Sequence, residues 1–310
     1  MEKRTLGRTG FAVSILSFGA APLGGVYGEI SDAAGIAAVR HAIDRGINFV
    51  DTSPYYGITR SESVLGEALQ GGYREKVILC TKAGRDTKTD FNFSREHITR
   101  SLDASLRRLR TDYVDILIAH DIEFADDFER VFTETADTLH ELKRTGKCRA
   151  VGMSGYPLGI LVKAVERCNL DVVLSYCHAT LINQQLFERL LPVAQQHGTG
   201  LINASPLSMG LLTMAGPPEW HPAPQAIKDA CRQAAAICQR HNVDLAKLAL
   251  SAVLHDSRLT TTLSGMSSVE EVDKNLAALE SPPDPAILAE VKQVLAPVST
   301  LTWPSGNWRD

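Results

Sequence analysis

The most regular feature of the chain is an alternation of short apolar runs, rich in β-branched residues, with longer amphipathic segments. The alternation repeats about eight times. Several runs are apolar at almost every position, as is typical of strands buried on both faces of a parallel sheet. The pattern predicts strands at 15–19, 48–51, 76–81, 113–119, 148–153, 172–175, 200–203 and 260–263.

The segments between these runs have the apolar spacing of helices. A capping residue precedes some of them, such as Ser94, and a glycine suited to a left-handed stop follows others, such as Gly146 and Gly198. The last two predicted helices follow one another without a strand between them, so one of them is extra. The pattern predicts helices at 33–45, 94–108, 128–144, 185–197, 226–240 and 245–254.

Alternating strands and helices imply right-handed crossovers and a parallel sheet. Eight such units favour a closed α/β barrel, the (β/α)8 TIM fold, over an open sheet. No GxGxxG follows the first strand, which also disfavours a dinucleotide-binding open sheet. We therefore expect one domain over 1–310, with an N-terminal hairpin at 1–13 and a C-terminal tail at 299–310. Long loops and the extra helix would lie at the C-terminal face, including an irregular stretch at 216–222.

Composition narrows the class further. The 310 residues are 44% hydrophobic and carry a net charge of -4 with mixed signs, which gives no electrostatic reason to bind nucleic acid or a membrane surface. No apolar run reaches the roughly 18 residues that a membrane span needs, and the N-terminus has no secretory pattern, so we expect a cytoplasmic protein. Its expected partner is a small molecule, and its expected state is a monomer or weak homodimer.

The six cysteines contain no CxxC pair. Cys231 and Cys238 lie seven residues apart on a predicted helix and are the best candidates for a metal site or disulfide. Reduced, buried thiols are the favoured interpretation, so no metal is predicted.

Polar residues follow three consecutive predicted strands. Asp51, Lys82 and His120 stand at these strand ends, and Tyr56 lies in the loop after Asp51. Barrel enzymes carry their chemistry at the C-terminal ends of the strands, so the four side chains should meet at one mouth. Singly, Asp51 and Lys82 could be a structural ion pair and His120 a core histidine. Together, the four residues favour catalysis.

The four side chains suit the transfer of a proton alongside a hydride. A tyrosine hydroxyl with a pKa of about 10 is a poor acid or base near neutrality. A neighbouring lysine favours the phenolate and lowers that pKa, and an aspartate keeps the lysine charged. The histidine can orient a substrate oxygen or take part in a proton relay.

Segment 51–57, DTSPYYG, resembles the signature of the aldo-keto reductase family. Lys82 in TKAG and His120 in IAHD match the family's lysine and histidine, and the resemblance extends over about 4–275. It implies that Tyr56 is the general acid/base, that Lys82 and Asp51 tune it, and that His120 orients the substrate.

The resemblance also implies a nicotinamide cofactor. Three positions depart from the family: Gly155 replaces an amide side chain that follows Ser154, Ser175 stands in place of a glutamine that holds the nicotinamide carboxamide, and Ala204 replaces an aromatic residue used for ring stacking. Glu271 and Gly265 stand where NADP-preferring members carry basic residues, so NAD is expected over NADP; alternatively, Glu271 is a solvated helix charge and Lys274 serves a phosphate. The implied cofactor residues are Ser154, Ser175, Ser205, Leu207, Met209, Gly210, Gly265, Ser267, Ser268, Glu271 and Asn275.

Longer strings, among them HDIEF at 120–124 and LTWPSG at 301–306, resemble one subgroup of the family, the plant-type L-galactose dehydrogenases. This implies oxidation of L-galactose or a related aldose at C1 to the lactone, with Tyr56 as general base. Tyr55, His120 and Trp303 would contact the sugar, although Trp303 is equally well explained as an anchor of the tail. The alternatives are an L-fucose or D-threo-aldose 1-dehydrogenase, a pyridoxal-type aldehyde reductase, and a non-catalytic cofactor-sensing subunit.

Overall fold

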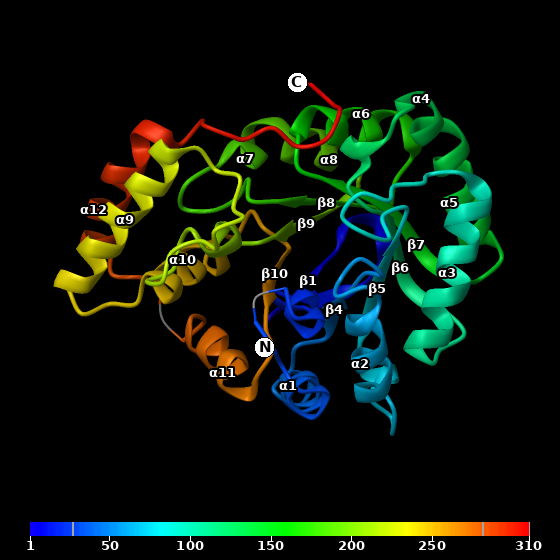
Figure 1. Ribbon diagram of the computed structural model, residues 1–310, viewed down its shortest axis with the longest axis horizontal. Helices are drawn as coiled ribbons and strands as arrows, with labels where there is room; N and C mark the ends of the chain where they lie inside the picture. Colours follow the sequence, from blue (N-terminus) through cyan, green and yellow to red (C-terminus); the bar gives the residue numbers. More distant parts are fainter. Residues whose placement is uncertain (27, 281, 310) are drawn as a thin grey trace.

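Eight parallel strands form a closed barrel, with helices around it (Figure 1). The computed structural model describes residues 1–26, 28–280 and 282–309. All eight predicted strands are confirmed to within a few residues at each end, and the last strand pairs with the first. In order around the barrel the strands are β3 (Leu16–Gly19), β4 (Phe49–Asp51), β5 (Ile78–Ala83), β6 (Val114–Ala119), β7 (Cys148–Gly155), β8 (Val172–Tyr176), β9 (Gly200–Ala204) and β10 (Thr261–Gly265).

Helices connect the strands and cover the outside of the barrel. One predicted helix changes its hydrogen-bonding pattern partway, and another is interrupted. Residues 128–144 contain a π-helical turn at Val131–Thr135, and 185–197 breaks at Leu190, where Pro192 removes an N–H from the first turn that follows. The helices are α1 (Asp32–Asp44), α2 (Arg60–Ala68), α3 (Arg95–Leu109), α4 (Phe128–Arg130), α5 (Ala136–Arg144), α6 (Leu158–Cys168), α7 (Gln185–Arg189), α8 (Leu191–Gln196), α9 (Gln225–Arg240), α10 (Leu245–Leu254), α11 (Val269–Ala277) and α12 (Pro285–Leu295).

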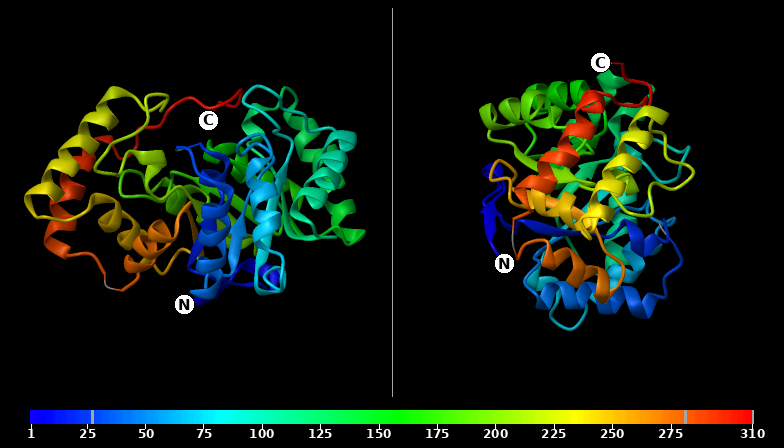
Figure 2. Two further views of the ribbon diagram at one scale, coloured as in Figure 1. Left: turned by 60° about the horizontal axis from the view of Figure 1, so that its bottom comes forward. Right: turned by 90° about the vertical axis from the view of Figure 1, so that its left-hand side faces the viewer.

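Sequence reasoning did not predict α2, α6, α11 or α12. Helices α2 and α6 have Thr59 and Pro157 at their N-cap positions, and neither residue makes a side-chain capping hydrogen bond. The extra helix is α9, because α10 leads directly into β10. Helices α9 and α12 lie side by side at the edge of the molecule (Figures 1 and 2).

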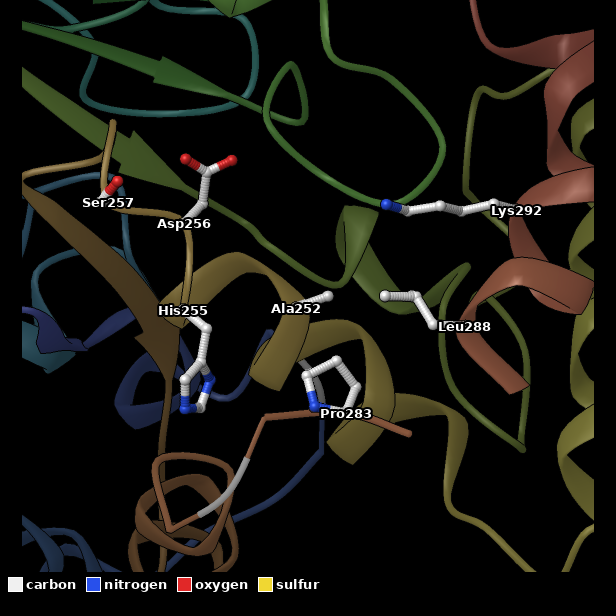
Figure 3. Close-up of a pocket in the computed structure, with 7 residues that line it drawn as sticks. All are labelled: Ala252, His255, Asp256, Ser257, Pro283, Leu288 and Lys292. Atoms are coloured by element: carbon white, nitrogen blue, oxygen red, sulfur yellow. The ribbon is translucent and has the colours of Figure 1, made fainter. Parts of the chain in front are cut away.

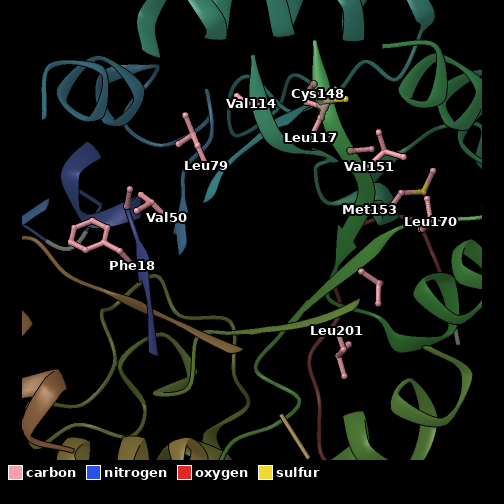
Figure 4. Close-up of a cluster of buried hydrophobic side chains, with 14 of the residues drawn as sticks. Phe18, Val50, Leu79, Val114, Leu117, Cys148, Val151, Met153, Leu170 and Leu201 are labelled. Atoms are coloured by element: carbon pink, nitrogen blue, oxygen red, sulfur yellow. The ribbon is translucent and has the colours of Figure 1, made fainter. Parts of the chain in front are cut away.

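The apolar core has two layers because the side chains of each strand alternate between the two faces of the sheet. Figure 4 shows the layer between strands and helices, which includes Phe18, Leu79 and Met153. A second cluster fills the barrel interior and includes Ile116 and Leu174. Because large buried residues fill both layers, a substrate has room only at the ends of the strands.

The N-terminal segment closes one end of the barrel. Strands β1 (Lys3–Thr5) and β2 (Ala12–Ser14) pair antiparallel, and Leu6 and Phe11 between them pack into the interior cluster. The main-chain N–H of Leu6 donates to the oxygen of Phe11 at 2.9 Å. This packing leaves the opposite end, where the strands finish, as the open face.

The C-terminal segment crosses that opposite face (Figure 2). The N–H groups of Asn307 and Trp308 donate to the main-chain oxygen of Glu123, at 2.7 and 3.3 Å. The ring of Trp308 lies edge-on to Phe128, with centroids 5.0 Å apart. The tail therefore packs on the loop after β6; Asp310, the last residue of the predicted tail, lies outside the described residues.

A hollow of about 370 Å³ lies between α10 and α12. Figure 3 shows the residues that line it. His255 and Asp256 line it, and both belong to the connection that enters β10 from its N-terminal end. The hollow is therefore on the side of the barrel that supports stability rather than chemistry.

None of the described helices is long and apolar enough to cross a membrane. All six cysteines are buried free thiols, and no acidic, histidine or cysteine cluster within the described ranges could hold a metal.

Candidate active site

Lys82 is the centre of a buried hydrogen-bonded group at the open face. Its Nζ donates to Asp51 Oδ2 at 2.6 Å, to the main-chain oxygen of Thr52 at 2.9 Å and to the Tyr56 hydroxyl at 3.1 Å. Strands β4 and β5 are paired, which brings Asp51 and Lys82 together, and the loop after β4 returns Tyr56 to them. The structure thus places three of the four predicted catalytic residues in direct contact.

His120, at the end of β6, completes the group. Its Nδ1 lies 2.9 Å from Ser53 Oγ, and its ring stands edge-on to Tyr56 with centroids 5.8 Å apart. Burial, with the positive charges of Lys82 and Arg85, holds the pKa of His120 well below its ordinary value. The imidazole is therefore neutral at neutral pH.

The charges in this group are set by competition between burial and ion pairing. Burial lowers the pKa of Lys82, but the negative charge of Asp51, together with that of Tyr56 when it is ionised, outweighs burial and keeps the pKa of Lys82 above its usual value. Burial raises the pKa of Asp51 more than Lys82 lowers it. Lysine 82 accordingly remains a cation next to the phenol.

Burial also raises the pKa of Tyr56 to about 12, against the opposing effect of Lys82. We expected Lys82 to bring this pKa below 10. The direction of the lysine's effect is as expected, but the cost of burying a phenolate is larger. In the protein alone, Tyr56 therefore carries its proton at neutral pH.

A buried ion pair that the sequence reasoning missed lies beside His120. Arg85 Nη1 donates to Asp121 Oδ2, and the guanidinium lies 3.7 Å from the centroid of the Tyr55 ring. The same Asp121 oxygen is 3.7 Å from His120 Nε2. Asp121 has a left-handed backbone with φ of 52°, a conformation that is uncommon for aspartate. The position of both residues just beyond strand ends was the signal that could have identified them.

Glu123 explains the glycine at 155. A Cβ on Gly155 would lie 2.7 Å from Glu123 Oε2, so a side chain there would collide with the carboxyl group. The other oxygen, Oε1, accepts from the Tyr156 N–H at 3.0 Å and from Ser305 Oγ of the tail at 2.9 Å. Burial, with the charge of Asp121, raises the pKa of Glu123 to about 8. The departure from the family at 155 therefore accompanies a buried carboxyl group that holds the tail.

The predicted cofactor residues on β7 and β8 are both buried. Ser154 Oγ accepts from the N–H of Asp121 at 3.1 Å. Ser175 Oγ has no partner among the described residues. Leu174 and Tyr176 pack with the barrel interior, so Ser175 between them takes the outer side of the strand. Tyr176 is in register with Ala204, which places an aromatic ring next to the position where we noted that one was missing.

The loop after β9 has an unusual backbone. Ser205, Ser208 and Met209 have φ of 54°, 49° and 53°, and Gly210 has φ of 100°. Clusters of left-handed residues are costly outside glycine and concentrate at ligand-binding loops, where their N–H groups can form anion-binding concavities. Leu207 packs within the same loop against the apolar core.

The start of α11 gathers the rest of the predicted cofactor residues. Ser268 caps the helix by accepting from the Glu271 N–H at 3.1 Å, and Glu271 Oε2 accepts from both the N–H and the hydroxyl of Ser267 at 2.7 Å. Lys274 pairs with Glu270 at 2.7 Å on the exposed face. The segment thus presents a carboxylate at the helix start; its predicted members are Gly265, Ser267, Ser268, Glu271 and Asn275.

Trp303 lies in the tail, and its ring contacts are with residues outside the Lys82 group. Its ring stacks on Tyr156, with centroids 4.6 Å apart and planes 18° apart, and stands edge-on to His221 at 5.2 Å. These contacts favour the anchoring interpretation of Trp303. Tyr55, the other predicted substrate residue, is adjacent to both Tyr56 and His120, with ring centroids 6.1 and 6.0 Å away.

Comparison with known proteins gives consistent matches over almost the whole chain. The family model described as Aldo/keto reductase family matches residues 15–296. The chain is 46% identical to the L-galactose dehydrogenase of Arabidopsis thaliana, over 99% of this chain and 98% of that protein. It is 37% identical to the D-arabinose 1-dehydrogenase of Saccharomyces cerevisiae, over 76% of this chain and 73% of that protein.

A solved structure agrees with the fold. The aldo-keto reductase AKR11C1 from Bacillus halodurans, in its holo form, superposes with a TM-score of 0.79 at 26% identity. The match covers 99% of both chains.

Proposed function

Because the chain belongs to the aldo/keto reductase family, we propose that it is an aldose 1-dehydrogenase that oxidises L-galactose, or a close relative, to the lactone with NAD as the hydride acceptor. The observation that carries the proposal is the buried contact of Lys82 with both Asp51 and Tyr56, with His120 alongside. The name of the similar yeast protein, a D-arabinose 1-dehydrogenase, supports C1 of a sugar as the reacting centre, and that of the Arabidopsis protein supports L-galactose as the sugar.

The residues at the open face fit a nicotinamide cofactor. Ser175 Oγ and Asn203 Oδ1 are buried polar atoms without a partner among the described residues, but strand alternation places both on the outer side of the barrel, so the proposal does not rest on them. The left-handed loop around Met209 suits the pyrophosphate. When bound, the nicotinamide ring supplies a carbon that accepts hydride from C1 of the sugar.

Tyr56 is the proton acceptor in this reaction. The C1 hydroxyl proton moves to the Tyr56 oxygen, the C1–H bond breaks with its electron pair leaving as hydride, and the C1–O double bond of the lactone forms. Lys82 stabilises the phenolate that must precede this transfer, and Asp51 keeps Lys82 charged. Because burial holds the pKa of Tyr56 high, oxidation should speed up as the pH rises.

The preference for NAD is proposed from Glu271. Its carboxylate lies at the start of α11, bonded to Ser267, where it would repel a phosphate and could accept a hydrogen bond from a ribose hydroxyl. The nearby cation, Lys274, is paired with Glu270.

The test is to follow the formation of the reduced cofactor when L-galactose, L-fucose or D-arabinose is added, each with NAD and with NADP. Rapid reduction of NAD with L-galactose supports the whole proposal, and Tyr56→Phe is the inactive control. If L-fucose or D-arabinose reacts fastest, the C1 chemistry stands and the sugar assignment is wrong. No reaction with any of the pairs would refute the proposed activity.

A further inference from the structure

Ser53 is a buried serine in the loop after β4 with two polar neighbours. Its Oγ accepts from the N–H of Tyr55 at 3.1 Å and lies 2.9 Å from Nδ1 of His120. A serine hydroxyl has one proton to donate and two lone pairs. Its single proton therefore links directly to the protonation of His120 Nδ1.

Two arrangements are compatible with the Ser53–His120 distance. In one, the hydroxyl donates to a bare Nδ1 and accepts from the Tyr55 N–H, so the Ser53 hydroxyl proton has an acceptor. In the other, Nδ1–H donates to Oγ, and the Ser53 proton is left buried without an acceptor among the described residues. Because an unsatisfied buried donor is costly, the first arrangement is favoured.

The contact on the other side of the His120 ring, at Nε2, favours the same position of the proton. Asp121 Oδ2 faces His120 Nε2 at 3.7 Å, and this oxygen already accepts from Arg85. A bare Nε2 lone pair would be repelled by the carboxylate, whereas an N–H would be attracted to it. Burial, together with the positive charges of Lys82 and Arg85, keeps the ring neutral, so the ring carries one proton, on Nε2.

We propose that Ser53 is a positioning residue that fixes His120 as the neutral Nε2–H tautomer, and that this N–H donates to the C1 oxygen of the sugar. The tautomer follows from the protein's own contacts; only the identity of the acceptor rests on the proposed function. It follows that His120 orients the sugar oxygen and does not take its proton, which leaves Tyr56 as the acceptor.

The tautomer is measured on the resting protein, without substrate, by nitrogen NMR of chains labelled with ¹⁵N-histidine. Correlations between ring nitrogens and ring carbon-bound protons distinguish the two tautomers and the imidazolium, and the His120→Gln variant assigns the signal. We expect a single neutral species with the proton on Nε2 near neutral pH. A proton on Nδ1, or a charged ring, overturns the proposal even if the enzyme oxidises sugars as proposed.

The functional arm compares Ser53→Ala with Ser17→Ala. Ser17 is also fully buried and bonded, to Thr261 at 2.7 Å, but lies outside the site and should leave turnover unchanged. Ser53→Ala should mix the His120 tautomers and lower kcat/KM about tenfold, the scale of one lost hydrogen bond, with cofactor binding retained. An unchanged tautomer and unchanged kcat/KM in Ser53→Ala would refute the positioning role. If the wild type oxidises none of the sugars, the proposed function fails while the tautomer can still be read.

Discussion

Replacing Lys82 by methionine tests both the stability and the chemistry of the buried group. Lys82 and Asp51 are both buried, and Asp51 Oδ1 already lacks a partner among the described residues. Removing the cation leaves a buried carboxylate unpaired, which typically costs about 3–5 kcal/mol. A domain that is stable by about 5–15 kcal/mol would remain folded but clearly weakened.

A second variant separates the stability lost because the Asp51 charge is unpaired from the stability lost because the Lys82 side chain no longer packs. Asp51→Asn combined with Lys82→Met removes the stranded charge as well, so the double variant should regain more than half of the lost free energy of unfolding. Urea unfolding at neutral pH measures both. Turnover should be lost in both by at least about 100-fold, because neither supports the Tyr56 phenolate.

The free energy of unfolding that Lys82→Met loses relative to the wild type should also depend on pH. Burial already raises the pKa of Asp51, and removing Lys82 raises it further. An acid with a folded-state pKa above its unfolded value near 3.9 takes up its proton first in the folded state. The stability gap between Lys82→Met and the wild type should therefore narrow as the pH falls from about 8 to about 5. A single variant as stable as the wild type, or a double variant no better than the single, would refute this reasoning.

The remaining predictions concern the phenol, the cofactor end and the glycine at 155. Tyr56→Phe should reduce turnover by about 10²–10⁴-fold while NAD binding, followed by quenching of protein fluorescence, stays nearly unchanged; a tenth of the activity remaining would exclude Tyr56 as the base. Glu271→Arg should shift kcat/KM towards NADP, and no shift would leave the proposed preference without support. Gly155→Ala should cost about 1–3 kcal/mol in urea unfolding, because its Cβ meets Glu123 Oε2 at 2.7 Å. In a chain that already carries Glu123→Ala, the Gly155→Ala change should no longer have that cost, and a fully stable Gly155→Ala in the otherwise native chain would contradict the packing described.

The barrel and the meeting of the four polar residues were predictable because both depend on local pattern. Strand periodicity and parallel connection place successive strand ends at one face, so Asp51, Lys82 and His120 had to be neighbours once the fold was known. The helices that were missed show the limit of this reasoning. α2 and α6 begin without a capping side-chain hydrogen bond, whereas α11 and α12 were missed although Ser268 and Asp284 cap them, so capping residues alone do not reveal a helix.

The sequence by itself therefore determined the architecture, the family resemblance and the residue types at the mouth. Only the tertiary structure decided how these residues behave. The proton of Tyr56 depends on a balance between burial and the charge of Lys82, and neither can be weighed without the surroundings of the phenol. The collision that a side chain at Gly155 would make with Glu123, and the attachment of Glu123 to the tail at Ser305, join residues far apart in the chain. Such contacts leave no periodic trace in the sequence, because they depend on shape and distance after folding.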